Sequence, residues 1–172
     1  MTGFRAAVSE ADPVFLDLML ERPTGETRFL LTRQQVVDLA QSLSRFNLFA
    51  DLGRPQLEAI ADPDWERSFS DGERVLRHGM SGAGFYVVLE GEAIVRIGER
   101  ELSRLLPGDF FGEVSTLLGA EPTADVIAAG PLHCLEIPGP KLEAFLLDYP
   151  RVMLRMLQTE ARRLQEALEW RS

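Results

Sequence analysis

The stretch from Phe110 to Ala128, FFGEVSTLLGAEPTADVIA, is the feature that most constrains the fold of this chain. Its middle part, Val114 to Leu118, is one apolar helical turn that follows Gly112-Glu113 and is broken by Gly119. Strand-like residues lie on both sides of that turn. A short helix after a glycine directs its free N–H groups and the positive end of its dipole back toward the glycine. The pattern therefore predicts a site for an anion such as phosphate, with Glu113 suited to accept a hydrogen bond from a sugar hydroxyl.

This strand–Gly-Glu–helix–strand unit resembles the phosphate-binding cassette of the cyclic nucleotide-binding domain, the module of cAMP- and cGMP-regulated kinases, channels and bacterial transcription regulators. The family pattern is Phe-Gly-Glu, an apolar residue, a small residue, a variable helical stretch, and then Pro-Arg-(Ser/Thr/Ala)-Ala-x-Val. The resemblance implies a possible ligand, cAMP or cGMP, and no other cofactor. The candidate ligand-binding residues are those that match the pattern: Phe111, Gly112, Glu113, Val114, Ser115, Thr123 and Ala124.

The cassette departs from the family pattern at one position. The arginine that pairs with the cyclic phosphate in the family should directly precede Thr123, and this chain has Pro122 there, with Glu121 before it. Losing a buried charge-assisted pair of this type costs about 2–5 kcal/mol. Affinity for a cyclic phosphate is therefore expected to fall at least about 30-fold. Four arginines in or beside the predicted strands are alternatives for the missing cation: Arg77, Arg96, Arg100 and Arg104.

Each candidate side chain also has a purely structural interpretation. The resemblance makes Glu113 the acceptor for the ribose 2′-hydroxyl, but its carboxylate is equally suited to cap nearby backbone N–H groups. Ser115 offers an N–H or a hydroxyl to a phosphate, or is simply the small residue that a tight helix requires. The Thr123 hydroxyl can donate, although a neutral donor replaces little of an arginine.

A second motif supports the resemblance. The family shows Gly-x-x-Gly-x-x, four apolar residues, two variable residues and a glycine. The segment from Gly79 to Gly91 fits this pattern except at Met80, where the family usually has an acid or an amide. These glycines permit the positive φ angles that a small β-roll needs at its corners, so we interpret them as structural.

Short apolar runs separated by turn residues fill the rest of the chain. We expect strands at 14–20, 27–31, 65–69, 73–77, 85–88, 92–97, 101–106, 124–128 and 132–137. Asp71-Gly72 is expected to form a tight hairpin turn. The sequence thus predicts the α+β class: an antiparallel β-roll of the jelly-roll type flanked by helices, with an N-terminal β-hairpin–helix extension. The expected domains are the extension, residues 1–45, and a cyclic nucleotide-binding-like domain, residues 46–172.

Two segments are candidates for assembly. An isolated hairpin is marginal in water, so the extension should dock on the next domain or on a second subunit, unless it is a misread helical segment. The helix expected from Arg151 to Trp170 carries an a/d seam of about two heptads: Leu154, Leu157, Ala161, Leu164 and Leu168. That helix corresponds to the family's C-helix, which caps the base and often dimerises. The alternative is a helix that packs back on its own roll.

Composition limits the class of function. A net charge of −9 and a pI near 4.8 argue against nucleic acid or an anionic membrane as the main partner. We find no transmembrane run and no signal-peptide pattern, so we expect a cytoplasmic protein. No metal-ligand spacing, nucleophile motif or P-loop occurs, so we do not expect an enzyme.

Two functions remain at this stage. The first is a regulatory sensor with neither a DNA-binding nor a catalytic domain, which binds a cyclic nucleotide weakly or not at all because of Pro122, and acts on a partner protein of unknown identity. The alternative is a ligand-independent dimeric scaffold, with contacts through the C-terminal helix or the N-terminal hairpin.

Overall fold

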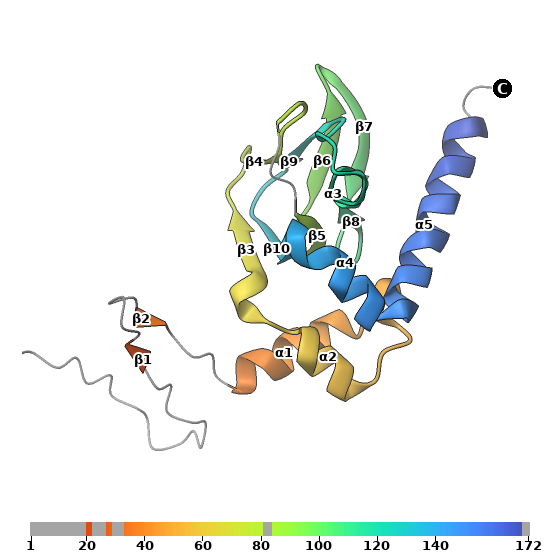
Figure 1. Cartoon of the computed structure of the whole chain (residues 1–172). Helices are drawn as coiled ribbons and strands as arrows, with labels where there is room; N and C mark the ends of the chain where they lie inside the picture. Colours follow the sequence, from red (N-terminus) through yellow and green to blue (C-terminus); the bar gives the residue numbers. More distant parts are fainter. Residues whose placement is uncertain (1–19, 22–26, 29–32, 81–83, 170–172) are drawn as a thin grey trace, which may run out of the picture.

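Two four-stranded antiparallel sheets form a roll, and helices cover one side of it (Figure 1). The computed structural model describes residues 20–21, 27–28, 33–80 and 84–169. The first sheet has the order β3 (Glu66–Phe69), β10 (Leu132–Ile137), β5 (Phe85–Glu90) and β8 (Phe110–Phe111). The second has the order β4 (Arg74–Leu76), β9 (Asp125–Ala128), β6 (Ala93–Ile97) and β7 (Arg100–Leu105). This architecture confirms the predicted antiparallel roll of the α+β class.

Strand β5 is buried on both of its faces, and the alternation of its side chains explains how the molecule is layered. Phe85, Val87 and Leu89 point toward the helices and join one hydrophobic cluster. Tyr86 and Val88 point into the roll and join a second cluster. Successive side chains of a strand point to opposite faces, so one central strand contributes to both cores. An almost unbroken apolar run is what such a strand requires.

The turn at Asp71-Gly72 is not a hairpin turn, contrary to the sequence prediction. Strand β3 pairs with β10, whereas β4 pairs with β9 in the other sheet. The Gly72 N–H donates to the carbonyl of Ala128, and the Asp71 carboxylate accepts from the N–H of Gly130. These contacts tie the turn to the end of β9. The chain therefore changes sheets at this corner, which brings β4 to the strand that follows the cassette.

The helices gather against the outer face of the first sheet (Figure 1). They are α1 (Arg33–Leu43), η1 (Asn47–Phe49), α2 (Arg54–Ile60), η2 (Pro63–Trp65), α4 (Gly139–Asp148) and α5 (Pro150–Glu169). Leu57 and Ile60 of α2 are both buried. Helix α4 can begin with Gly139-Pro140, because proline is tolerated in a first helical turn, where its missing N–H is not needed. Pro150 likewise begins α5.

Helix α1 belongs to the same hydrophobic cluster as α2, α4 and α5. Its buried residues are Leu39, Ala40 and Leu43, which were among the predicted apolar positions of this helix. Before it, β1 (Leu20–Glu21) and β2 (Thr27–Arg28) form an antiparallel pair. The rest of the two predicted N-terminal strands lies outside the described residues. The domain division at residue 45 remains a prediction.

Helix α5 packs on the core through its first half only. Val152 and Met156 are its buried residues, and Arg155 forms a bidentate ion pair with Asp51, with N–O distances of 2.8 and 3.0 Å. Beyond this point the helix stands beside the roll (Figure 1). Four of the five predicted seam residues are leucines with 42, 64, 62 and 56% of their surface exposed: Leu154, Leu157, Leu164 and Leu168. Among the described residues, no helix is long and apolar enough to span a membrane.

Candidate functional site

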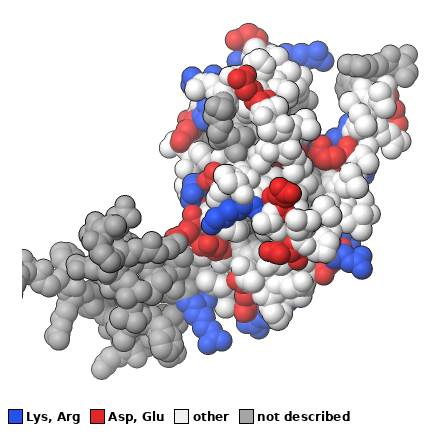
Figure 2. Space-filling view, viewed as in Figure 1, with Lys and Arg blue, Asp and Glu red and all other residues white. Residues whose placement is uncertain are grey.

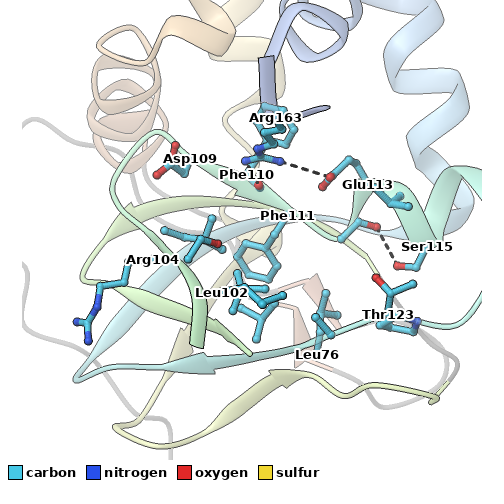
Figure 3. A pocket seen from close by; sticks show the side chains of 18 of the residues that line it. Leu76, Leu102, Arg104, Asp109, Phe110, Phe111, Glu113, Ser115, Thr123 and Arg163 are labelled. Atoms are coloured by element: carbon cyan, nitrogen blue, oxygen red, sulfur yellow. Dashed lines mark hydrogen bonds and ion pairs between the residues drawn. The ribbon is translucent and has the colours of Figure 1, made fainter. Parts of the chain in front are cut away.

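A pocket of about 1080 Å³ lies between the inner surface of the roll, the cassette and helix α5 (Figure 3). Its walls come from β7, from the segment between β8 and β9, and from the second half of α5. All seven candidate residues from the sequence line it, as does Pro122. The structure therefore brings the candidates together at one concavity. Their contact with a ligand remains a prediction.

The local geometry of the cassette depends on Gly112. This residue precedes α3 (Glu113–Leu118) and has a φ of 84°, a conformation that L side chains rarely adopt. A Cβ atom added here would also clash with the backbone oxygen of Gly84. The carbonyl of Gly112 accepts the N–H of Thr116 and, at 3.2 Å, the hydroxyl of Ser115. The Ser115 hydroxyl is thus engaged inside the cassette, which favours its structural interpretation.

Glu113 is a buried acid in the wall of the pocket, with only 6% of its surface exposed. Its Oε1 lies 3.4 Å from Nη1 of Arg163, and its Oε2 has no hydrogen-bond partner among the described residues. Burial raises the pKa of this carboxyl to about 7. Its own backbone N–H opposes the rise, the charge of Glu160 adds to it, and the charge of Arg163 opposes it. Glu113 is therefore a buried acid in the pocket wall whose charge is only partly compensated by Arg163.

Arg163 links helix α5 to the cassette. Its Nη2 donates to the carbonyl of Phe110 at 2.9 Å, and its guanidinium lies 4.6 Å above the ring of that residue. Its Nη1 contacts Glu160 at 2.7 Å and, more distantly, Glu113 (Figure 3). Arg163 was not among the candidate site residues predicted from the sequence. The signal for its role is that the buried stripe of Val152 and Met156 continues at helical spacing to Glu160, Arg163 and Ala167.

At the end of the pocket where the family places its arginine, the lining residues are Pro122, Thr123 and Ala124, which carry no charge. Pro122 is buried, and its carbonyl accepts the N–H of Gly79. Thr123, next to it, is exposed. In Figure 3, Thr123 and Arg163 lie at opposite ends of the pocket, with Glu113 near Arg163. Arg163 therefore does not occupy the place of the missing arginine.

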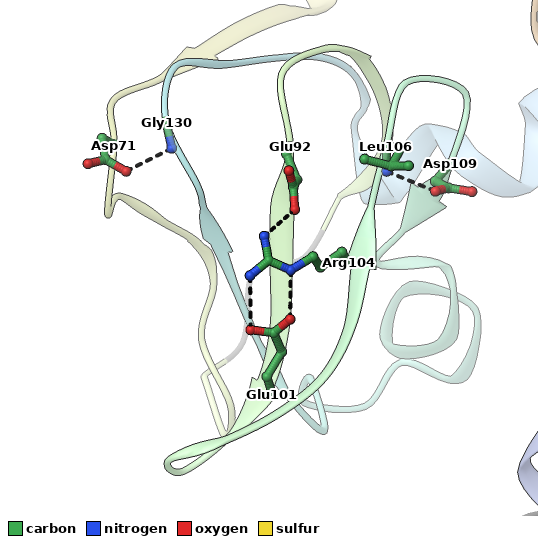
Figure 4. Close-up of polar contacts among 7 residues, drawn as sticks. All are labelled: Asp71, Glu92, Glu101, Arg104, Leu106, Asp109 and Gly130. Carbon is green, nitrogen blue, oxygen red and sulfur yellow. Dashed lines mark hydrogen bonds and ion pairs between the residues drawn. The ribbon is translucent and has the colours of Figure 1, made fainter.

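Two of the four alternative arginines, Arg100 and Arg104, line the pocket. The guanidinium of Arg104 is held between Glu92 and Glu101 (Figure 4). In Figure 3 it points away from the other labelled side chains of the pocket. Arg100 is exposed at the first position of β7. Arg96 contacts Glu99 and the carbonyl of Gly98 instead.

Acidic side chains outnumber basic ones around the pocket. Four of its lining residues are acids, Glu101, Asp109, Glu113 and Glu166, and three are arginines. Two further acids outside the lining, Glu92 and Glu160, pair with two of those arginines. On the face shown in Figure 2, acidic and basic side chains are interspersed among the described residues. The excess of acidic groups around the pocket therefore comes from the residues at the pocket, and not from a generally acidic face of the molecule.

The described residues show no sign of metal or thiol chemistry. None of their histidine, cysteine, aspartate and glutamate side chains form a group of three that could hold a metal ion. Cys134 is fully buried in β10, and burial raises the pKa of its thiol to about 12. Its thiol therefore stays protonated at neutral pH.

The described residues thus form an antiparallel roll with a Gly-Glu cassette and with helix α5 beside the pocket. Residues 66–149 match the model of the cyclic nucleotide-binding domain family. The sequence is 27% identical over 136 residues to a cGMP-dependent protein kinase of Eimeria tenella, a match that covers 79% of this chain and 14% of that protein. Residues 66–149 of this chain are therefore similar to the cyclic nucleotide-binding domain family.

Solved structures share the fold. The CBD2 domain of PKAR bound to Sp-2Cl-cAMPS matches with a TM-score of 0.65 and 20% identity, over 78% of this chain and 92% of that chain. The Thermus thermophilus catabolite activator protein matches with a TM-score of 0.63 and 27% identity, over 72% and 61%. The regulatory subunit of a cAMP-independent protein kinase A from Trypanosoma brucei matches with a TM-score of 0.64 and 21% identity, over 78% and 52%.

Proposed function

We propose that this chain is a non-catalytic regulatory module, in which a small ligand in the pocket changes the position or mobility of helix α5. The observation that carries the proposal is the contact of Arg163 on α5 with Glu113 and with the carbonyl of Phe110. A ligand that bonds to Glu113 alters the charge and hydrogen bonding that Arg163 meets. Ligand binding in the pocket is thereby coupled to the position or mobility of α5, and α5 can contact a partner protein.

We further propose that cAMP and cGMP bind weakly. The cyclic phosphate would lie near Pro122, where the residues that line the pocket carry no positive charge. The guanidinium of Arg163 lies across the pocket and is already paired with Glu160. Two relatives differ in their printed dependence on a cyclic nucleotide. The Eimeria protein is a cGMP-dependent kinase, and the Trypanosoma subunit belongs to a cAMP-independent kinase. A variant of that subunit with three substitutions, one of them to arginine, is bound to cAMP in its A site.

Calorimetric titration with cAMP and cGMP up to millimolar concentration tests the affinity. We expect saturation only in the millimolar range. A micromolar constant would mean that Arg100 or backbone N–H groups hold the phosphate, and the weak-binding proposal would then be wrong. Hydrogen exchange at the highest ligand concentration tests the coupling. Exchange in residues 157–169 should change with occupancy, and unchanged exchange at saturation would contradict a role for α5.

A second candidate function is a ligand-independent dimeric scaffold. The observation that favours it is the row of exposed leucines on α5, together with Pro122 in the cassette. In this function, the molecular mass in solution would be that of a dimer, and saturating the pocket would change neither the mass nor the exchange of α5. A regulatory module is distinguished from this scaffold by a change in the hydrogen exchange of α5 when ligand binds, whether the protein is a monomer or a dimer.

A further inference from the structure

We propose that Glu113, Glu160 and Arg163 form a proton-controlled latch between the cassette and the second half of helix α5. The latch holds the helix while Glu113 is protonated and releases it when Glu113 loses its proton. This inference rests on the proposed function, because it names a regulator of the same helix, the proton, which acts without a ligand. Three features of the described residues carry it: the sparse apolar packing of this half of α5, the placement of two acids at one arginine, and the burial of Glu113.

The second half of α5 has little apolar packing to hold it in place. The buried residues of this helix lie in its first half. Arg163 supplies polar contacts from the second half to the cassette, at 2.9 Å to the carbonyl of Phe110 and at 3.4 Å to Glu113. The position of this half is therefore sensitive to charge at the cassette. Its three leucines have 56 to 64% of their surface exposed: Leu157, Leu164 and Leu168.

Two acids share one arginine where the helix meets the cassette. Nη1 of Arg163 lies 2.7 Å from Oε1 of Glu160 and 3.4 Å from Oε1 of Glu113. When both acids are ionised, one negative charge is left without compensation. When Glu113 is protonated, the charges of Arg163 and Glu160 balance each other. The proton on Glu113 therefore decides whether a net negative charge lies between α5 and the cassette.

Burial makes that negative charge unfavourable. Glu113 has 6% of its surface exposed, and its Oε2 has no hydrogen-bond partner among the described residues. A carboxylate in this place has lost its hydration, and a helix that moves away would let water reach it. Burial is also the largest cause of the rise in the pKa of Glu113 to about 7.

The side chains of α5 add to this rise. The charge of Glu160 raises the pKa of Glu113 more than the charge of Arg163 lowers it, and a hydrogen bond between the two acids raises it further. Because both groups leave with the helix, release of α5 should lower the pKa of Glu113. Helix α4 and strand β5 also pack against α3; the Tyr86 hydroxyl of β5 donates to Glu136. The charged side chains of α4 and β5 are exposed: Lys141, Glu143, Asp148 and Glu90.

The difference in proton affinity sets the direction of the latch. The docked helix gives Glu113 the higher pKa, so docking is favoured fully at pH values below the pKa of the released state. This advantage is lost as pH rises to about 7, the pKa of the docked state. Release of one proton changes the docking equilibrium by at most about 10-fold per pH unit. Acid therefore closes the latch, and neutral or alkaline pH opens it.

Hydrogen exchange of the full chain from about pH 5.5 to about pH 8, corrected for the intrinsic exchange rate at each pH, tests the latch. We expect the protection of residues 157–169 to fall at least about 3-fold over this range. Their protection should also stay below that of β5 at every pH, because the helix opens without unfolding of the roll.

Two outcomes would overturn the latch. A smaller fall in protection would mean that the proton does not control α5. Protection equal to that of β5 would mean that the helix leaves the cassette only when the whole protein unfolds. Either outcome would leave the proposed function standing, because a ligand at constant pH could still act on α5. The titration with ligand at one pH tests that function separately.

Two pairs of variants identify the groups involved. Glu113→Gln replaces the carboxyl with a neutral amide and should keep α5 protected up to about pH 8, whereas Glu121→Gln, at an exposed position of the cassette, should retain the wild-type pH dependence. Glu160→Gln should reduce the fall in protection, and Glu166→Gln, which removes an exposed acid of the same helix, should not. Carbon-13 NMR of the glutamate carboxyls should show that Glu113 titrates at lower pH in Glu160→Gln than in the wild type.

Thermal melting confirms that each variant is folded before exchange is measured. A wild-type pH dependence in folded Glu113→Gln would show that another group senses the proton, and the latch would be wrong. If Glu113→Gln did not fold, the Glu160→Gln and Glu166→Gln pair would decide. An equal fall in protection in those two variants, with an unchanged titration of Glu113, would equally overturn the latch.

Discussion

Glu113 is a buried ionisable residue that is also a candidate ligand-binding residue. Its carboxyl is shielded from water, faces one arginine and one acid, and retains an oxygen without a partner. A protein stabilises such a group poorly, and a side chain that is costly to bury is a candidate for a functional role rather than a structural one. The same burial makes Glu113 responsive to pH.

We predict that Glu113 makes the protein less stable as pH rises from about 4.5 to about 7, the usual pKa and the raised pKa of its carboxyl. In this range the unfolded chain has released the proton and the folded chain still holds it, so each step up in pH favours unfolding. The full effect is on the order of 3 kcal/mol. Denaturant titration at several pH values measures it. Glu113→Gln should lack this part of the pH slope, and Glu121→Gln should keep it; equal slopes in all three proteins would contradict the raised pKa.

Gly112 makes a second prediction at the residue scale. Gly112→Ala should lower the free energy of unfolding by more than about 3 kcal/mol, because the φ of 84° is strained for alanine and its Cβ would clash with the carbonyl oxygen of Gly84. Gly72→Ala is the matched control. Its φ is 76°, but nothing lies within 4 Å of the added Cβ, so only the backbone strain of about 1–2 kcal/mol applies. Thermal or chemical denaturation compares the two. If both variants lost the same stability, the close approach at Gly84 would not be what requires glycine in the cassette.

The sequence could group the candidate cassette residues because their information is local. Gly112, Glu113 and the short helix are neighbours along the chain, and all seven candidates line one pocket. Arg163 was missed as a site residue because it is 50 positions from Glu113 in sequence, and only the direction of α5 places it there. Spacing could not have identified which arginines point into the pocket either, since Arg104 is turned away by its bonds to two acids.

At the scale of elements, the sequence predicted the existence of strands better than their partners. The strand after Asp71-Gly72 was expected to pair with the one before it, as in a hairpin. The structure instead pairs it with β9, through contacts to Ala128 and Gly130 that lie far along the chain. A tight turn with Gly at a positive φ serves equally in a hairpin and at a corner between sheets. Local sequence cannot separate the two.

Helix α5 gives a prediction at the same scale. Its first half is held by Val152, Met156 and the Arg155–Asp51 ion pair, and Arg163 ties the second half to the cassette. Arg163→Gln should therefore speed hydrogen exchange in residues 157–169 and leave exchange around Met156 unchanged. Arg162→Gln is the control, because that exposed side chain contacts only Thr159 of its own helix among the interactions found for the described residues. Unchanged exchange in Arg163→Gln would mean that the contact with the cassette does not restrain the helix.

Among the described residues, helix α5 exposes a row of apolar side chains. Seam residues Leu157 and Leu164 have 64 and 62% of their surface exposed, whereas Arg163 of the same helix lines the pocket and pairs with Glu160. Leucines are seldom left exposed in a regular row, and burying them at about 25 cal/mol per Å² is a driving force for association. The heptad spacing fits a second α5 helix better than an irregular surface.

We predict that the chain dimerises through this seam, with a dissociation constant in the micromolar range because only about two heptads contribute. Sedimentation equilibrium should give about twice the 19.2 kDa of one chain at high concentration and a lower mean mass on dilution. Leu157→Glu combined with Leu164→Glu should remove the dimer, because two like charges would face each other across the seam at each position. Gln158→Glu adds a charge to an exposed position beside the seam and should leave the dimer intact. A wild-type protein that stays monomeric at every concentration would contradict the seam as a dimer interface, and a dimer that persists in the double leucine variant would place the interface elsewhere on the molecule.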